Sequence, residues 1–262
     1  MIASLTLLIT YVALAIPAAL LGIPWTLISG DITFLYRWSM WIIRTGLGLA
    51  RIRIEVTGRE LVPAGTACIF MSNHISNLDP PILLPLIPGR TSVFLKRSLM
   101  KIPVLGYGMR LGDFIPVDRD GKLESAKESV RVGVQVLRSG LHVMTFVEGT
   151  RSRTGRLLPF KKGPFHLATE SGAPVIPVSI WGTESMMKKG GLTITPGTAY
   201  VRFHGPLWPR DFPNRDALLM AVREAMESGL PEWMCEEKAD PSRAPLRKKV
   251  AALRYAAVEH AK

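Results

Sequence analysis

A histidine and an aspartate lie five positions apart in a short polar stretch after an apolar run, and two prolines follow the aspartate. The residue before a proline avoids the α-helical region, so we expect Asp79 to end a loop and to cap a helix that begins at Pro80. Such a loop can turn the carboxylate back onto His74. A carboxylate that fixes the tautomer of an imidazole and stabilises its charged form makes that imidazole a general base. One pair of this kind also arises by chance, so a function needs further residues.

A second polar stretch, from Phe146 to Ser152, also follows an apolar run. It combines a carboxylate at Glu148, a flexible backbone at Gly149, a hydroxyl at Thr150 and a guanidinium at Arg151. Together these groups can grip a phosphate and a polar neighbour. A charged surface turn with an internal ion pair is the alternative.

Basic residues recur where predicted strands end. Lys96 and Arg97 close one apolar run, and Arg119 comes just after another. Lys161 and Lys162 form a further basic pair. We expect this distribution to hold a phosphate group.

From residue 51 onward, short apolar runs alternate with stretches of helical periodicity, which predict helices over 122–138 and 215–227. This order indicates an α/β domain with a largely parallel central sheet flanked by helices. Functional residues should then lie in loops at the strand ends. The predicted strands are 51–56, 67–72, 92–95, 114–117, 143–147, 175–181 and 199–204.

No Asp, Glu, Lys, Arg or His occurs between Met1 and Gly30. About 20 apolar residues suffice to cross a bilayer core, so this segment is a candidate membrane helix. Pro17 and Pro24 argue against one straight rod, because a proline inside a helix removes a backbone hydrogen bond. A cleaved signal peptide is the alternative, although a basic leading region is missing. The sequence leaves open whether the segment crosses the bilayer or dips in and returns.

The next segment, 32–49, is aromatic and apolar, and arginines recur every seven residues at Arg37, Arg44 and Arg51. Seven residues are almost two helical turns, so we expect one basic stripe on a helix at the headgroup boundary. A core helix with a solvated edge is the alternative. Arginines directly after an apolar segment place the rest of the chain in the cytoplasm.

We therefore divide the chain into membrane-anchoring helices over 1–52, a catalytic domain over 53–234 and a basic tail over 235–262. The tail carries an apolar stripe beside lysines and arginines. It is either a second surface-binding helix or a plain solvated one.

The chain of 262 residues has 33 Lys and Arg against 21 Asp and Glu, which gives a net charge of +12 and predicts an anionic partner. Nucleic acid is one such partner, but the apolar first segment favours a membrane instead. The two cysteines, Cys68 and Cys235, lack the spacing of a metal site and suit a reducing cytoplasm. We expect no metal and no cofactor, because the sequence has no His-Glu-x-x-His, Walker or dinucleotide pattern.

Four blocks of the sequence, in order, resemble those of the glycerophospholipid acyltransferase family. They are Asn73–Asp79, Gly112–Arg119, Phe146–Ser152 and Val175–Val178. The likeness extends from about residue 55 to residue 210. Val147 stands where the family usually has proline, and Pro116 is unusual in the second block. Neither departure removes a reactive group.

The resemblance implies transfer of a fatty acyl group from acyl-CoA or acyl-carrier protein to the sn-2 hydroxyl of 1-acylglycerol-3-phosphate, giving phosphatidate. His74 would be the general base and Asp79 would orient it. The family's pattern implies that Arg119 and Arg151, with Lys96, hold the acceptor phosphate. Residues 148–150 (Glu148, Gly149 and Thr150) would place its glycerol.

The resemblance also implies a protein of the cell inner membrane whose catalytic domain faces the cytoplasm. Gly-x-Ser-x-Gly is absent from the sequence, so direct transfer is expected rather than an acyl-enzyme. Two alternatives stay open. One is the same chemistry on another lysolipid, and the other is a non-catalytic membrane lipid-binding protein.

Overall fold

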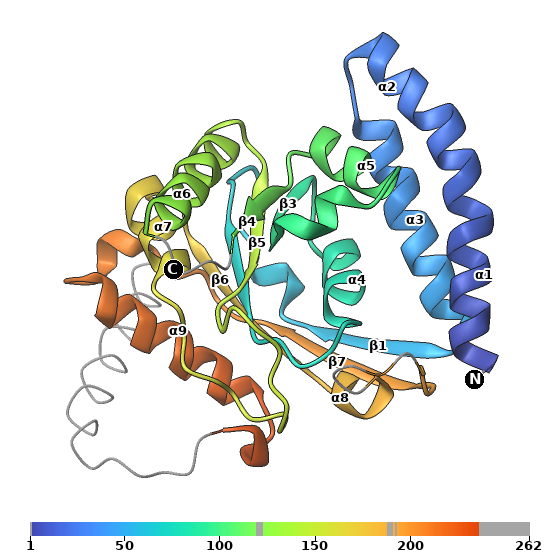
Figure 1. The fold of residues 1–262 in the computed structure, drawn as a ribbon. Helices are drawn as coiled ribbons and strands as arrows, with labels where there is room; N and C mark the ends of the chain where they lie inside the picture. The colour runs from blue at the N-terminus through green and yellow to red at the C-terminus, as the bar shows by residue number, and fades with distance from the viewer. Residues whose placement is uncertain (1, 119–122, 188–190, 192, 236–262) are drawn as a thin grey trace.

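A seven-stranded sheet forms the centre of the protein in the computed structural model, which describes residues 2–118, 123–187, 191 and 193–235 (Figure 1). The strand order is β1-β7-β6-β2-β5-β3-β4. The strands are β1 (Ile52–Thr57), β2 (Ile69–Ser72), β3 (Thr91–Lys96), β4 (Ile115–Val117), β5 (His142–Phe146), β6 (Val175–Trp181) and β7 (Gly197–Phe203). Each predicted strand is present, so the α/β class is confirmed.

Five neighbouring strands of the sheet run in the same direction. β2 pairs in parallel with both β5 and β6, β3 pairs in parallel with β5 and β4, and only the β6–β7 pair is antiparallel. The carboxyl ends of β6, β2, β5, β3 and β4 therefore lie along one edge of the sheet. Polar residues that follow these strands are brought together there.

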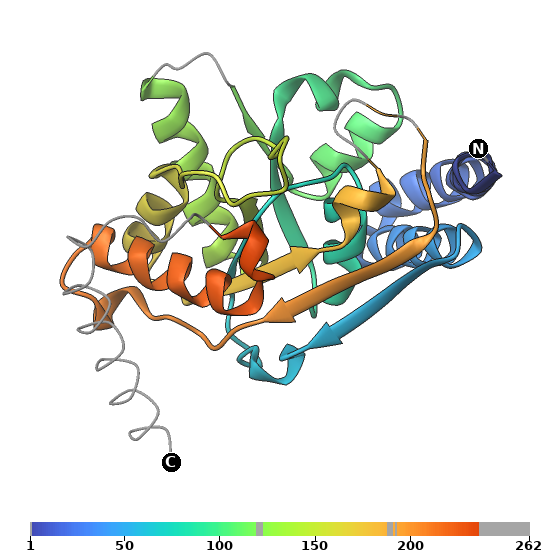
Figure 2. The ribbon, with the colours of Figure 1, turned by 90° about the horizontal axis from the view of Figure 1, so that it is seen from below.

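Helices cover both faces of the sheet (Figures 1 and 2). α6 (Leu123–Arg138), α7 (Gly163–Ser171) and α9 (Arg215–Gly229) pack over one face, and α3 (Thr33–Leu49) and α4 (Asp79–Leu83) over the other. Side chains alternate between the faces of a strand, so Phe70 of β2 joins the core under α3 and α4, whereas Ile69 and Met71 join the other core. Both predicted helices are confirmed where the structure describes them.

The first helix is long, and few of its residues are buried. α1 (Ile2–Pro17) continues through a π-helical turn (Ala18–Gly22) into α2 (Ile23–Ser29). The π-helical turn begins immediately after Pro17, as expected for a helix that must accommodate a lost backbone hydrogen bond. Residues 2–29 are long and apolar enough to cross a membrane, and only 11% of their most apolar window is buried. A core helix of a soluble protein would be mostly buried, so this surface suits a lipid environment.

α1 and α3 lie side by side as a helical hairpin (Figures 1 and 2). Gly46 lies directly against the ring of Tyr11, so the hairpin is close-packed at this point. On its other side, α3 packs against the domain, and the hydroxyl of Tyr36 accepts a hydrogen bond from the backbone N–H of Thr91 at 3.1 Å. α3 is therefore a helix of the core that also exposes a stripe.

The exposed stripe of α3 carries Arg37 and Arg44 together with Phe34 and Trp41. The prediction that Arg51 continues this stripe is wrong. Arg51 follows the helix with a positive φ of 57°, which turns the chain into β1. The predicted tail helix and Arg119 lie outside the described residues.

Candidate active site

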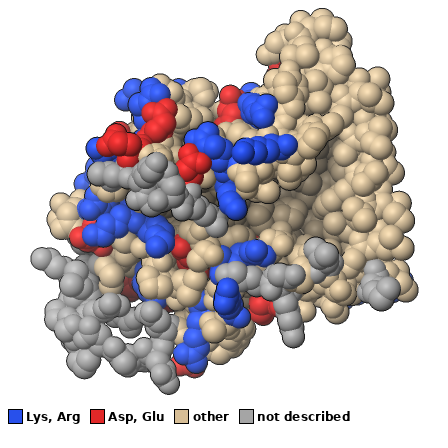
Figure 3. All heavy atoms as spheres, viewed as in Figure 1, with Lys and Arg blue, Asp and Glu red and all other residues tan. Residues whose placement is uncertain are grey.

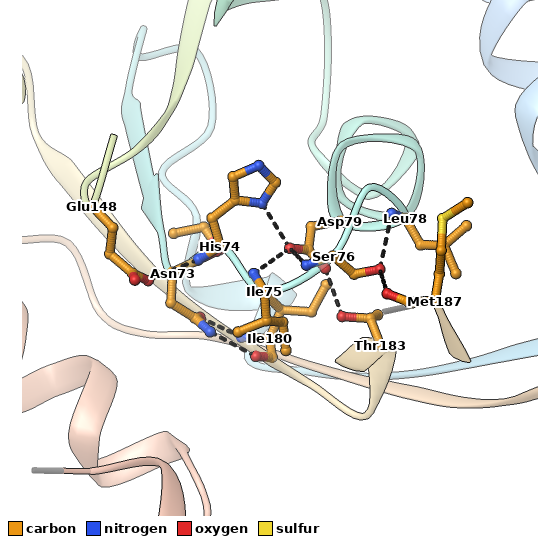
Figure 4. A network of polar contacts seen from close by, with 11 residues as sticks. Asn73, His74, Ile75, Ser76, Leu78, Asp79, Glu148, Ile180, Thr183 and Met187 are labelled. Atoms are coloured by element: carbon orange, nitrogen blue, oxygen red, sulfur yellow. Dashed lines mark hydrogen bonds and ion pairs between the residues drawn. The ribbon is translucent and has the colours of Figure 1, made fainter. Parts of the chain in front are cut away.

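The loop between β2 and α4 holds a buried carboxylate that gathers its neighbours (Figure 4). Oδ2 of Asp79 accepts hydrogen bonds from Nδ1 of His74 at 2.8 Å, from the N–H of Ile75 at 2.7 Å and from the N–H of Ser76 at 2.8 Å. The expected contact between His74 and Asp79 is confirmed. Asp79 is the first residue of α4 and not its cap, and its side chain points back into the loop.

His74 has the geometry of a general base. With Nδ1 donating to Asp79, the tautomer leaves the lone pair of Nε2 available. The side chain is 14% exposed, so the ring is accessible without being solvated freely. Its ring stacks on that of Phe146, with centroids 3.9 Å apart. The imidazole is thus fixed in position and in tautomer.

Thr183 is a partner of this pair that the sequence did not reveal. It follows β6, is fully buried and donates its hydroxyl proton to Oδ1 of Asp79 at 2.6 Å. Four donors therefore surround one carboxylate that has no contact with water. These donors stabilise the negative charge of Asp79. That charge would in turn stabilise the protonated ring of His74.

Asn73 holds the start of the loop between β2 and α4 against the sheet. Its amide nitrogen donates to the carbonyl oxygen of Ile180 at 2.8 Å, and its Oδ1 accepts from the N–H of Ile180 at 2.9 Å. The side chain thus pairs with β6 as a backbone residue would, just beyond the end of β2 (Figure 4). Ser76 adds a link to the segment after β6 by donating to the carbonyl oxygen of Met187 at 3.0 Å.

Glu148, the residue expected to place the glycerol, lies against the loop between β2 and α4. It is 1% exposed, and its two oxygens accept backbone hydrogen bonds from His74 at 2.9 Å and from Leu158 at 3.1 Å. Burial raises the pKa of Glu148 to about 7, against the opposing effect of these hydrogen bonds. The carboxylate therefore ties the loop after β5 to the backbone of His74.

The three residues after Glu148 lie nearer the surface. Gly149 has a φ of +68°, and a Cβ there would also press on the side chain of Lys161. Thr150 is exposed and Arg151 half-buried. The next N–H, that of Ser152, donates to the carbonyl oxygen of His74 at 2.8 Å, so this loop reaches the backbone of His74.

Basic residues also stand at the ends of the outer strands. Lys96, the last residue of β3, is exposed, and Arg97 pairs with Asp118 after β4 at 2.8 Å. Arg119, the other expected phosphate contact, lies outside the described residues. Figure 3 shows this face hollowed over α4, beside α3, with Lys and Arg side chains along the rim away from the hairpin.

The part of the chain that holds this arrangement is similar to known proteins. A family model described as Acyltransferase matches residues 53–181, the part that contains the loop between β2 and α4 and the loop after β5. The chain is 31% identical over 198 residues to the mouse 1-acyl-sn-glycerol-3-phosphate acyltransferase alpha, covering 71% of this chain and 70% of the mouse protein. The chain belongs to the acyltransferase family.

This acyltransferase also resembles a plant enzyme and a bacterial protein of known structure. It is 32% identical over 179 residues to the 1-acyl-sn-glycerol-3-phosphate acyltransferase of Cocos nucifera, covering 67% of this chain but only 54% of the coconut protein. The crystal structure of the 1-acyl-sn-glycerophosphate (LPA) acyltransferase PlsC from Thermotoga maritima superposes with a TM-score of 0.71 at 26% identity, covering 87% of this chain and 93% of that one. This acyltransferase thus shares its fold with PlsC over most of its length.

The buried carboxyl of Glu148 gives the stability of this acyltransferase a testable pH dependence. Its folded-state pKa of about 7 lies above the value of 4.5 expected in the unfolded chain. The contribution to stability is therefore complete below pH 4.5 and is lost as the pH rises to about 7, by up to about 3 kcal/mol. Glu148→Gln cannot ionise and should lack this loss.

The amide of Glu148→Gln has one acceptor for two backbone donors, so the variant should also be less stable at pH 5 by about 1–3 kcal/mol. Urea unfolding of both proteins between pH 4.5 and pH 8 measures the two effects. The exposed Glu170→Gln on α7 is the control, with a pH profile like that of the natural protein. Parallel profiles for the natural protein and Glu148→Gln would contradict the assignment.

Proposed function

We propose that this protein transfers a fatty acyl group from a thioester donor to the sn-2 hydroxyl of 1-acylglycerol-3-phosphate, giving phosphatidate. The observation that carries the proposal is the 2.8 Å contact between Nδ1 of His74 and the fully buried Asp79. Membership of the acyltransferase family supports the reaction type. The names of the mouse, coconut and Thermotoga proteins support the acceptor.

His74 accepts the proton of the acceptor hydroxyl on Nε2 while the oxygen attacks the thioester carbonyl. A neutral imidazole is too weak a base to make a free alkoxide, so proton transfer accompanies the attack. The tetrahedral intermediate collapses as the carbon–sulfur bond breaks. The proton then passes from His74 to the departing thiolate, which leaves as a thiol. Asp79 stabilises the imidazolium between these two transfers.

The acceptor phosphate binds through Arg151 and Lys96 and, by the family's pattern, Arg119, which lies outside the described residues. Guanidinium groups match the geometry of a phosphate and bind it with two parallel hydrogen bonds. Thr150, which is exposed and precedes Arg151 in the loop after β5, places the glycerol in this proposal. We give Glu148 a positioning role instead, because both of its oxygens accept backbone hydrogen bonds.

The protein works at the cell inner membrane, with its catalytic domain in the cytoplasm. The exposed apolar helix over residues 2–29 supports membrane binding, and the arginines that follow it support the orientation. Acyl-CoA or acyl-carrier protein then arrives from the cytoplasm as the acyl donor. The reaction requires no further cofactor, since the donor already carries an activated acyl group.

Replacing the general base tests the mechanism. His74→Ala should lower the turnover of lysophosphatidate with acyl-CoA by about a thousandfold, within the range found for general-base catalysis. Transfer of radiolabelled acyl groups to several lysolipids, with acyl-carrier protein as a second donor, measures the activity. The control is His166→Ala on the exposed side of α7. Full turnover by His74→Ala would refute the mechanism, and no transfer by the natural protein to any acceptor would refute the function.

Thr183 provides a sharper test of how Asp79 is held. Thr183→Val keeps the shape of the side chain but removes the donor to Oδ1, so kcat should fall about ten- to a hundredfold. The KM for lysophosphatidate should change little, because Thr183 is buried away from the rim. Thr183→Ser restores the hydroxyl and should recover most of kcat. Equal kcat values for the Val and Ser variants would show that this hydrogen bond is not needed.

Arg151 discriminates among acceptors. A phosphate monoester carries more charge than the phosphodiester of another lysolipid, so Arg151→Ala should raise the KM for lysophosphatidate about tenfold or more and that for lysophosphatidylethanolamine less. Initial rates with both acceptors provide the measurement, and the exposed Arg153→Ala on the same loop is the control. An equal effect on both acceptors would argue against a phosphate monoester as the preferred substrate.

A further inference from the structure

A groove along α3 is separate from the candidate active site, because no residue of the loops after β2 and β5 lines it. It is formed by the start of α3 and the turn before it, and has a volume of about 820 Å³. The residues that line it are Asp31, Thr33, Phe34, Arg37, Trp38 and Trp41. A cation, an anion and three aromatic rings thus share one open groove.

The cation of the groove is Arg37. The next arginine of the same stripe, Arg44, donates to the carbonyl oxygen of Pro85 and so serves the packing of α3. Arg37, by contrast, has no acidic partner within the part of the chain that the structure describes. An exposed guanidinium in such a groove is a binding group for phosphate.

The anion of the groove is held in place by the backbone. Oδ1 of Asp31 accepts a hydrogen bond from the N–H of Thr33 at 2.8 Å, at the first turn of α3. Hydrogen bonds from Thr33 hold the pKa of Asp31 below its usual value, so the carboxylate is charged at neutral pH. The groove therefore offers a fixed negative charge as well as a positive one.

The aromatic walls suit a cation at the depth of lipid headgroups. Phe34 and Trp38 meet edge to face with their centroids 5.4 Å apart, and Trp41 is 52% exposed. Aromatic faces attract ammonium groups, and tryptophan gathers at membrane interfaces. The neighbouring helix ends in exposed apolar residues, among them Trp25 and Ile28.

We propose that this groove binds the headgroup of a zwitterionic phospholipid, with the phosphate on Arg37 and the ammonium group between Asp31 and the aromatic rings. The proposal uses the membrane association of the hairpin but not the acyl transfer. A lipid held in this way would fix the rotation of α3 about its own axis relative to the bilayer surface. It would therefore set the direction in which the catalytic face points.

The full chain in dodecyl maltoside micelles, titrated with short-chain lipids and followed by calorimetry, tests the proposal. The probes are dihexanoyl phosphatidylethanolamine, dihexanoyl phosphatidylcholine, dihexanoyl phosphatidylglycerol and dihexanoylglycerol. The natural protein should bind at least one of the two zwitterionic lipids about tenfold or more tightly than the phosphatidylglycerol, and the lipid without phosphate least. The ethanolamine and choline lipids distinguish a primary from a quaternary ammonium group.

Two variants separate the two charges. Arg37→Gln should weaken binding of all three phospholipids about tenfold or more. Asp31→Asn keeps an oxygen for the N–H of Thr33 but loses the charge, and should weaken only the zwitterionic lipids. Arg53→Gln, an exposed arginine of β1, should bind as the natural protein does.

Unchanged binding by Arg37→Gln, or equal affinity of the natural protein for phosphatidylglycerol and both zwitterionic lipids, would overturn the proposal. Acyl transfer by Arg37→Gln to lysophosphatidate in the same micelles should equal that of the natural protein. This measurement separates a test of the proposed headgroup site from a test of the proposed acyl transfer.

Discussion

A carboxylate without contact with water must find hydrogen-bond donors for its lone pairs. Without them, the loss of its hydration is not replaced, and the buried charge destabilises the fold strongly. Asp79 satisfies this requirement with groups from the loop after β2 and with Thr183 from the segment after β6. The loop, the sheet edge and the orientation of His74 are consequently one cooperative unit. Breaking any of these contacts leaves the charge under-solvated and perturbs the rest.

The site contains a second buried carboxyl that serves a different purpose. Asp79 accepts from the ring of His74 and so affects its charge, whereas Glu148 accepts from the backbone N–H of the same residue and affects only its place. The contact with Asp79 is local to the loop after β2, whereas the contact with Glu148 depends on the parallel pairing of β2 with β5, which end at the same edge. One carboxyl from its own loop and one from the loop after β5 thus hold His74.

Local pattern was enough to predict the strands, the two long helices and the contact of His74 with Asp79, because each depends on residues close in sequence. Thr183 could not be predicted in this way, since it lies 104 positions from Asp79 and becomes its neighbour only through the pairing of β2 with β6. The pairing of Asn73 with Ile180 has the same origin. The prediction for Arg51 was wrong for a local reason. Helical spacing carries no information about the positive φ of Arg51, which follows the end of α3.

The two prolines after Asp79 explain how a helix can begin in the interior of the protein. A helix start normally leaves several N–H groups in search of acceptors, and an aspartate there usually serves them. Pro80 and Pro81 have no N–H, the N–H of Asp79 donates to the carbonyl oxygen of Ser76, and that of Ile82 to Leu78. No donor of this first turn needs the carboxylate. Because the helix makes no demand on it, Asp79 is free to face backward and serve the histidine.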